Sequence, residues 1–445
     1  MTLLKTTRFA GGLAVLGFTL AQTGTAQAYE LLSSPDGALN LDVLAVHGWM
    51  HSRKNYDNYD GRSGGSSWRE GFAKYGFSGH RTLGGTGDVY GALDWVSSAT
   101  WGDGDAGGNS VGSERRTSLE EAYLGWRSGE RFPFLGTDGL DLSAGRQVVQ
   151  LGKGFIINDD GLNLGEGPAG GALDRGGAYY LAARHAFDRT AVARIGGDRG
   201  LHGTAAWLAS DNRAQADTEL LAGTLDYTGE AGTLGLTAVH GLDVDDAWAD
   251  DFLRQRDGMN VYSLRGDSDL GIANADFAFE YARQYKDAGT ETAWYGQARY
   301  TFADLAWTPT LTYRYTRYSA DWDSLFTGQN SPDLGTWFQG EVASNYAGIF
   351  ARNTGIHHVG LSLSPTQSLS LGALFFDFTT LEHRDARNLD ARELDLYASW
   401  MATEHIAVSP LVGFYKPDKS AADGGTQVGD NDTNVYAQLV LAAFF

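Results

Sequence analysis

The stretch from Asn434 to Phe445 reads NVYAQLVLAAFF and carries the clearest structural signal in the chain. Every second residue from Val435 to Phe445 is apolar, so a strand here presents one continuous apolar face. A strand with so long an apolar stripe at the end of a chain suits the closing strand of an outer-membrane barrel, where the stripe meets lipid. A terminal phenylalanine is also typical of the signal that barrel-insertion machinery reads. This stretch therefore predicts an all-β, transmembrane, antiparallel up-and-down barrel.

The other end of the chain agrees with that prediction. Lys5 and Arg8 give a basic start, residues 9–20 are an apolar run, and Ala26-Gln27-Ala28 is a small-x-small cleavage site. The apolar run is too short for a convincing membrane helix, and nothing later approaches the roughly 18 apolar residues that a spanning helix needs. We therefore expect a signal peptide at 1–28, a barrel at 29–445, and location in the outer membrane of a Gram-negative cell.

Between these ends, alternating segments of strand length are separated by clusters of Gly, Asp, Asn and Ser. With the less regular candidates, the segments predict an even-numbered barrel of about 18 strands, which is wide enough for an aqueous lumen. The regular segments are Leu39–Val46, Asp88–Val96, Leu119–Arg127, Gly139–Gln147, Tyr179–Phe187, Glu219–Tyr227, Leu234–Leu242, Asn274–Gln284, Trp294–Phe302, Thr308–Tyr318, Thr336–Tyr346, His358–Leu363, Leu369–Phe378, Glu393–Met401, Ile406–Tyr415 and Asn434–Phe445. The less regular candidates lie near 68–79, 190–196, 201–209 and 259–266.

Composition excludes several functional classes. The chain has no cysteine, which excludes disulfides, thiolate metal sites and thiol catalysis. Its net charge of −21 argues against nucleic acid as a partner. Local sequence contains no nucleophile, histidine and acid arrangement of the kind that hydrolases use, so we expect no enzyme activity. The 60 glycines and 54 aromatic residues (12 Trp, 21 Tyr and 21 Phe) suit turns and the two interfacial girdles of a barrel.

Alternation also predicts which side chains face the lumen. An arginine at mid-depth on the lipid side would cost about 2–4 kcal/mol, so mid-strand arginines are driven inward. The strands at 294–302 and 310–316 turn Gln297, Arg299 and Arg314 inward. The same reasoning places these further residues in the lumen: Arg127, Glu121, Tyr123, Arg184, Arg194, Arg265 and Glu341. Two interpretations of the arginines remain open: they pair with carboxylates and stiffen the wall, or they guide an anionic solute.

The segment Leu151–Gly176 is a candidate for a loop that folds into the pore. It is long, rich in glycine and partly apolar, with Lys153, Phe155, Asn158 and Asp159 as candidate constriction residues. A plain surface loop fits the same features.

Four patches of the sequence resemble the alginate-export family of outer-membrane porins. They are residues 120–127 (EEAYLGWR), 145–147 (GRQ), 335–341 (GTWFQGE), and 361–366 (LSLSPT) with 369–372 (LSLG). The resemblance implies an 18-stranded monomeric barrel with an arginine-rich constriction that passes an anionic uronic-acid polymer. It places Arg146 and Gln339 among the residues of that path, with Arg127 at the end of the first patch. After Gln147 the chain departs from the family, because VVQLGKG replaces its charged, loop-entering residues.

Acidic loops offer a second kind of site. Residues 243–251 and 158–161 are rich in aspartate, and oxygen-rich loops can hold calcium. Solvated loops without an ordered ion are the favoured interpretation, and no EF-hand spacing is present. Residues 165–170 match G-x-G-x-x-G, but no buried strand precedes them and Pro168 interrupts the motif.

The sequence as a whole predicts a porin for anionic or sugar-like solutes, including a polysaccharide, that needs no cofactor and contacts outer-membrane lipid. The alternatives are a surface-binding or structural barrel whose acidic loops hold calcium, and a general porin.

Overall fold

The computed structural model describes residues 29–59, 61–328, 333–335, 337–383 and 387–445, so the predicted signal peptide lies outside the described residues. Within these ranges the chain is almost entirely β-structure. The elements are β1 (Tyr29–Ser34), β2 (Gly37–Ser52), β3 (Ser66–Thr82), β4 (Asp88–Gly102), β5 (Arg115–Arg127), β6 (Leu140–Gln147), β7 (Phe187–Ile195), β8 (Gly200–Ala209), β9 (Glu219–Gly229), β10 (Gly232–Asp243), β11 (Asn260–Ser268), β12 (Ala275–Lys286), β13 (Gly289–Thr301), β14 (Thr310–Tyr318), α1 (Glu341–Asn345), β15 (Thr354–Thr366), β16 (Leu369–Thr380), β17 (Ala391–Thr403), β18 (Ile406–Pro417) and β19 (Asn434–Phe444).

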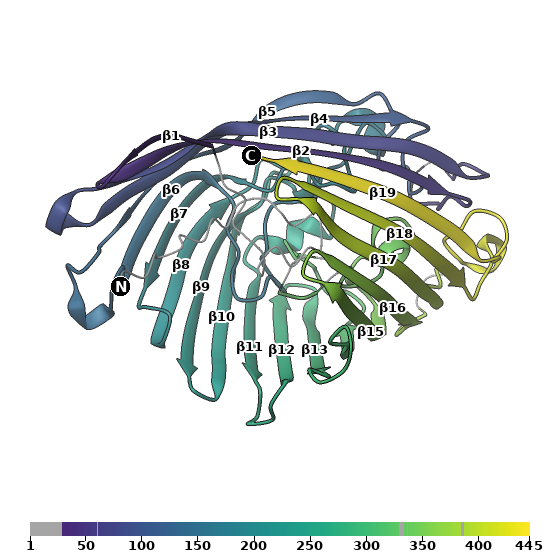
Figure 1. Ribbon diagram of the computed structural model, residues 1–445. Helices are drawn as coiled ribbons and strands as arrows, with labels where there is room; N and C mark the ends of the chain where they lie inside the picture. Colours follow the sequence, from purple (N-terminus) through teal and green to yellow (C-terminus); the bar gives the residue numbers. More distant parts are fainter. Residues whose placement is uncertain (1–28, 60, 329–332, 336, 384–386) are drawn as a thin grey trace.

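Strands β2 to β19 form a closed antiparallel barrel, which has 18 strands in the described part of the chain. Each strand pairs with its neighbours in sequence, and β19 pairs back with β2, from Tyr436 beside Ser52 to Phe444 beside Leu44. Figure 1 shows the ring, with β19 lying next to β2. Closure satisfies the backbone hydrogen bonds of every strand, which is what allows strands to cross hydrocarbon. The predicted fold class and strand number are confirmed.

Strand β1 is not one of the 18 strands that form the barrel. It pairs with the first residues of β2, from Tyr29 beside Leu41 to Ser34 beside Gly37. Strand β19 pairs with β2 only from Leu44 onward, so β1 occupies the part of that edge that β19 leaves free. It therefore covers backbone groups of β2 that would otherwise be unpaired.

The side chains of β19 alternate as the sequence predicts. Tyr436, Val440 and Ala442 are buried inside the barrel, whereas Leu439 and Phe445 are exposed on the outer wall. The outward residues form the apolar surface that a membrane requires. Among the described residues, no helix is both long enough and apolar enough to cross a membrane.

Connections at the two ends of the barrel differ in length. One end, here the turn end, has short turns such as 230–231 and 404–405, and the other, the loop end, carries most of the long loops. Short turns are periplasmic and long loops extracellular in outer-membrane barrels. The two longest loops are residues 148–186, here the first inward loop, and residues 319–353, here the second inward loop.

Two predicted strands are wrong, and both fall in these loops. Of the predicted strand Tyr179–Phe187, residues 179–186 precede β7 and are irregular, with Leu181 and Ala186 buried, and only Phe187 belongs to β7. Residues 337–346 contain α1 instead of a strand, and Thr336 lies outside the described residues. Both segments are apolar on both faces because they pack inside the barrel, and a short apolar run of this kind imitates a buried strand.

Candidate solute pathway

The first inward loop lies inside the barrel and packs on its inner wall. Val149, Phe155 and Ile157 are buried. The ring of Phe155 lies edge-on to Tyr295 of β13, with 5.1 Å between the ring centroids, and stacks against Tyr318 of β14 at 5.9 Å. Of the two alternatives for this segment, the loop folded into the barrel therefore agrees with the structure. Phe155 is the aromatic residue that packs it on the wall.

The predicted polar constriction residues of this loop are divided between its tip and its interior. Asn158 donates to the carboxylate of Asp159 at 2.6 Å, and the same carboxylate lies 2.9 Å from the ring Nδ1 of His185. Lys153 lies at the tip, where its side chain is 39% exposed. Of these three residues, only Lys153 has a side chain that is more than a third exposed.

The second inward loop is held by two buried arginines and one buried carboxylate of other elements. Arg256, which follows β10, forms a buried ion pair with Asp323 of the loop at 2.8 Å. Arg314 of β14 donates to the carbonyl oxygens of Leu334 and Phe338, the latter at 2.7 Å. The carboxylate of Glu393 on β17 accepts the N–H groups of Val342 and Ala343, at 2.6 and 2.9 Å, and so caps the start of α1. Arg314 therefore binds the loop through its carbonyl groups, and Glu393 binds it through its N–H groups.

The two inward loops also bind each other. The N–H of Asn158 donates to the carbonyl of Phe326 at 2.8 Å, and the N–H of Gly328 donates to the carbonyl of Gly154 at 3.0 Å. The hydroxyl of Thr327 adds a hydrogen bond of 2.8 Å to the carbonyl of Phe155. Together the two inward loops form one connected structure inside the lumen, here called the partition.

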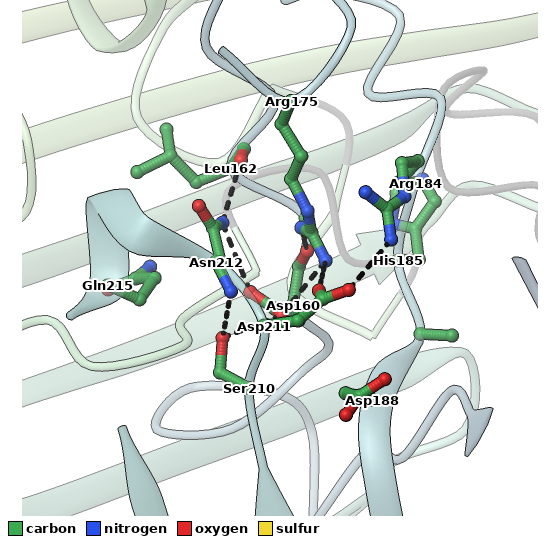
Figure 2. Close-up of polar contacts among 12 residues, drawn as sticks. Asp160, Leu162, Arg175, Arg184, His185, Asp188, Ser210, Asp211, Asn212 and Gln215 are labelled. Carbon is green, nitrogen blue, oxygen red and sulfur yellow. Dashed lines mark hydrogen bonds and ion pairs between the residues drawn. The ribbon is translucent and has the colours of Figure 1, made fainter. Parts of the chain in front are cut away.

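Three arginines converge on one carboxylate, Asp211, where the first inward loop meets the wall. Figure 2 shows two of them, Arg175 and Arg184, beside Asp211. Asp211, which follows β8, receives Arg146 from the end of β6 at 2.9 Å. Arg175 and Arg184 approach it from the first inward loop at 3.2 and 3.1 Å. We call these four residues the arginine cluster. It ties the loop to the segment after β8, which Arg146 joins to the end of β6.

Further carboxylates surround the arginine cluster. Arg175 lies 2.9 Å from Asp160, Arg146 lies 2.6 Å from Asp188, and Arg184 lies 3.5 Å from Glu120. Ser210 and Asn212 donate to Asp160 as well (Figure 2). Three guanidinium groups thus face four carboxylates, so this part of the lumen carries no excess of positive charge.

The electrostatics of Asp211 follow from this geometry. Burial raises the pKa of an isolated carboxyl, but Arg175, Arg184 and Arg146 outweigh it and hold the pKa of Asp211 well below its usual range. Burial, together with the charge of Arg175, lowers the pKa of Arg184. Asp211 is therefore ionised at any pH that the protein meets, and the cluster is a permanent anchor.

Two β-bulges bring these groups together. The register of β6 against β7 shifts between Gly145 and Gln147, and Gly145 has a φ of +128°. A Cβ on Gly145 would lie 2.4 Å from the carbonyl oxygen of Ala122, so only glycine fits. A second shift, between β4 and β5, accommodates Glu120 as an extra residue, so that Glu120 and Glu121 are both buried. Bulges re-aim side chains in this way.

A second buried group, here the carboxyl cluster, comprises Glu341 of α1 and Glu393 and Asp395 of β17. The Glu341 N–H lies 3.4 Å from Asp395, and the Tyr180 hydroxyl lies 3.3 Å from the Glu341 carboxylate. In the described ranges no Lys, Arg or His lies within ion-pair distance of these carboxyls. Burial, with the neighbouring Glu393, raises the pKa of Glu341 well above its usual value.

A cavity of about 280 Å³ lies between the tip of the first inward loop and the inner wall. Its polar lining includes Lys153, His202, Asp226, Arg265 and Asp267. The side chain of Lys153 lies 3.8 Å from Asp267 and 3.9 Å from Asp333. Arg265 is instead buried and pairs with Asp226.

Other cations of the lumen also make long, half-exposed pairs. Arg127 and Arg194 share Asp141, at 3.5 and 3.9 Å, with side chains 30% and 41% exposed. Arg299 lies 3.5 Å from Asp276 and is 50% exposed. The arginines that alternation places inward therefore fall into two classes, one locked and one accessible.

The remaining predicted residues contact other groups of the interior. Glu121 pairs with Lys74, and the ring of Tyr123 lies 6.3 Å from that of Tyr90. Gln297 accepts from Arg314 at 3.2 Å. Gln339 donates to the hydroxyl of Tyr318 at 2.8 Å. Gln339, Glu341 and Arg184 lie on the inward loops, not on the strands from which their positions were predicted.

Sequence reasoning missed Lys74, Arg175 and Asp211. Lys74 lies on β3, where period-two alternation from the buried Phe72 identifies it as inward. Arg175 and Asp211 lie in loops, and no periodicity marks a loop residue that reaches the lumen.

The aspartates of loop 243–251 have local partners. Asp245 and Asp250 accept backbone N–H groups of the next turn, and Asp246 and Asp251 pair with Arg254. Within the described ranges, no group of three or more His, Cys, Asp or Glu side chains is arranged to hold a metal ion.

Comparison with known proteins adds the fold class. No protein-family model and no curated protein matches the chain. Among solved structures, Pseudomonas aeruginosa OccK2 (OpdF) aligns over 92% of this chain and 97% of its own, at 13% identity and a TM-score of 0.57. Pseudomonas aeruginosa OccK11 (OpdR) aligns over 91% and 96%, at 13% identity and 0.55. Acinetobacter baumannii OccAB1 aligns over 94% and 99%, at 10% identity and 0.57.

These solved structures are Occ/OprD-type outer-membrane porins with 18-stranded barrels. At such low identities the likeness concerns the fold alone. The chain has the fold of a multi-pass outer-membrane β-barrel, in agreement with the predicted localisation.

Proposed function

We propose that this chain is an outer-membrane porin through which small anionic or sugar-like solutes diffuse. The observation that carries the proposal is the accessible set of luminal cations, Arg127, Arg194 and Arg299. Their nearest carboxylates lie at 3.5 to 3.9 Å, beyond ordinary hydrogen-bond distance. Such cations can exchange a carboxylate of the wall for one of a passing solute.

Weak, exchangeable contacts suit a channel. A solute that binds too tightly does not leave, so several shallow sites pass it faster than one deep site. Guanidinium groups favour carboxylate oxygens because they donate in pairs. The carboxylates beside these cations keep the affinity low and also accept hydroxyl groups of a sugar.

The size of the cavity favours small solutes. Its volume of about 280 Å³ lies at the lower limit of the range for small-molecule sites, about 300–1,000 Å³. A uronic-acid polymer, which the resemblance to alginate-export porins implies, would pass only after the two inward loops had moved. We therefore propose small solutes as the principal cargo, transport by a monomer, and no cofactor.

Single-channel recording in a planar bilayer tests this function. We expect ohmic current steps with a reversal potential shifted toward the anion. The double variant Arg194→Gln/Arg299→Gln should move the reversal potential toward the cation, because the neighbouring carboxylates Asp141 and Asp276 remain. Arg283→Gln is the matched control, because that arginine points outward from β12 beside the Tyr285 ring.

An unchanged reversal potential in the double variant would exclude these arginines from the pathway. A cation preference of the parent protein would identify a general porin.

The partition formed by the two inward loops favours a second candidate, a closed barrel with a structural or surface-binding role. A closed barrel predicts no current steps from protein that migrates as folded barrel on unboiled gels. Uptake of small acidic solutes into proteoliposomes distinguishes the two candidates independently of conductance.

A further inference from the structure

Arginines on the outer wall gather at the loop end of the barrel. By alternation and exposure, each of the following faces outward near the loop end of its strand: Arg69, Arg115, Arg189, Arg283, Arg317 and Arg392. The whole chain carries a net charge of −21, so this accumulation runs against its composition. If the loop end is extracellular, these cations lie at the level of the outer-leaflet headgroups.

Only two of these six arginines pair with a carboxylate in the described part of the chain, Arg189 and Arg392. Arg189 pairs with Glu219 at 3.1 Å, and Arg392 lies 3.6 Å from Asp377. In the described part of the chain, neither Arg69 nor Arg115 forms an ion pair. Both nevertheless lie on a surface that faces hydrocarbon and headgroups, where an unpaired charge is costly unless an anion meets it.

The guanidinium groups of Arg69 and Arg115 both lie near the ring of one tryptophan, Trp101. The guanidinium carbon of Arg115 lies 4.6 Å from the ring centroid of Trp101, and that of Arg69 lies 5.9 Å from it. Arg115 also donates to the carbonyl oxygens of Thr100 and Glu114, which fixes its position. A tryptophan of this kind marks the membrane interface. The pair is therefore held in place at headgroup depth.

A trough in the outer wall begins beside this pair. Its volume is about 830 Å³, and its lining includes Arg115 and Trp101. The trough exists because four neighbouring strands contribute small outward residues where long ones would fill it: Ala45, Gly71, Ala73, Ser97, Ala99 and Ala443. Few polar side chains lie in it, so its occupant is apolar.

We propose that this surface binds one phosphorylated lipid of the outer leaflet. The phosphate lies between Arg69 and Arg115, and an acyl chain lies in the trough. Guanidinium groups match phosphate oxygens in pairs, and the low water content at this depth strengthens the contact. A free anion would leave the trough empty. A second copy of this chain would bring another Arg69 and Arg115 toward the same pair with no carboxylate between them.

Native mass spectrometry of the detergent-solubilised barrel tests the proposal. The probes are a synthetic hexa-acylated glucosamine disaccharide with two phosphates and its phosphate-free counterpart. We expect one phosphorylated lipid to remain bound, with an affinity at least tenfold above that of the phosphate-free lipid. Arg69→Gln/Arg115→Gln should reduce that affinity by about tenfold or more, because it removes charge-assisted hydrogen bonds.

Two further variants separate the parts of the site. Arg81→Gln is the matched control, since Arg81 is exposed at the turn end of β3, and it should bind like the parent. Ala99→Phe fills the trough while both arginines remain, and it should weaken binding of the phosphorylated lipid.

Equal binding by the double variant and the parent would overturn the proposal, as would equal binding of the two probes. A dimer that Ala99→Phe abolishes would identify a second chain as the occupant and overturn it as well. All variants are first checked for heat-modifiable migration on gels, which reports a folded barrel.

Discussion

The two inward loops occupy the same lumen but are held by different sets of charged groups. The first inward loop is held by two of its own arginines, Arg175 and Arg184, directed at Asp211 after β8, and by backbone N–H groups that donate to Glu120 of β5. The second is held by its backbone, whose carbonyls accept from Arg314 and whose N–H groups donate to Glu393, and by the buried ion pair of its Asp323 with Arg256. The cations that anchor the first loop therefore lie on the loop itself, whereas the cations that anchor the second lie outside it.

This difference determines how each loop responds to a change of conditions. The arginine cluster matches cations with carboxylates, so that removing one charge leaves another buried and unpaired. The carboxyl cluster has no matching cation among the described residues, so its stability depends on protons. We expect the first loop to be more sensitive to substitution than to pH, and the second to be sensitive to both.

The largest effect should follow from Arg175→Met. The substitution keeps the apolar stem of the side chain but leaves the carboxylate of Asp160, which is fully buried, without its cation. Removing one partner of a buried pair costs about 3–5 kcal/mol. Hydrogen exchange of residues 148–186 should accelerate accordingly, while that of the barrel strands should not.

Arg254→Met is the control for that experiment. Arg254 pairs with Asp246 and Asp251, whose side chains are almost fully exposed. Exposed pairs contribute about 0–1 kcal/mol, so exchange of the first inward loop should match that of the parent. Equal exchange of the first loop in parent and Arg175→Met would contradict the ion-pair anchor.

A somewhat smaller effect is expected from Arg314→Gln. The variant loses charged hydrogen bonds to the carbonyls of Leu334 and Phe338, each worth about 1.5–3 kcal/mol. The second inward loop should then exchange faster than the first, and single-channel conductance should rise because the partition loosens. Acceleration confined to the first loop would reverse the assignment of the anchors.

A pH titration of loop protection should separate the two loops further. The pKa of Glu341 is raised in the folded state, so the native protein holds a proton that the detached loop releases. Protection of residues 341–346 should therefore be complete below about pH 4.3, the usual value for Glu, and fall as pH rises through the raised pKa. Glu341→Gln should abolish this fall.

The sign is opposite for Asp211, whose pKa is depressed. Its contribution is complete above the usual value for Asp, about 3.9, and is lost only as pH falls through the depressed pKa. From about pH 6 to about pH 9 the contribution of Asp211 to protection of the first inward loop, corrected for the intrinsic exchange rate, should be constant. Burial lowers the pKa of His185 but Asp159 raises it by more, so a small loss of protection is expected as pH rises through that raised pKa. A fall in the first loop that parallels the second would show that one shared group controls both.

The barrel was predictable from sequence because lipid imposes a simple rule on it. Outward residues such as Leu439 must be apolar, and inward ones such as Gln297 are free to be polar, so period two reveals both wall faces. The inward loops obey no such rule. Tyr180 and Trp337 pack against other protein, and their apolar runs resemble strands that do not form.

The ion-pair partners of the luminal arginines could not be predicted from the sequence either. Alternation places Arg265 and Arg299 on the same side of the wall, yet one is buried against Asp226 and the other half exposed beside Asp276. The difference arises from which neighbours the register and the loops bring within reach. The two β-bulges, which add Glu120 and re-aim Arg146, cannot be read from periodicity because they interrupt it.

The smallest effect should come from Arg299→Gln as a single variant. Arg299 is half exposed, lies 3.5 Å from Asp276, and makes no recorded contact with either inward loop within the described ranges. Pairs of this kind contribute about 0–1 kcal/mol and are screened by salt. Exchange of both loops should therefore equal that of the parent, while the reversal potential moves slightly toward the cation at low salt and returns at high salt. A loosened partition in this variant would mean that accessible arginines also hold the loops, and the division between locked and accessible arginines would fail.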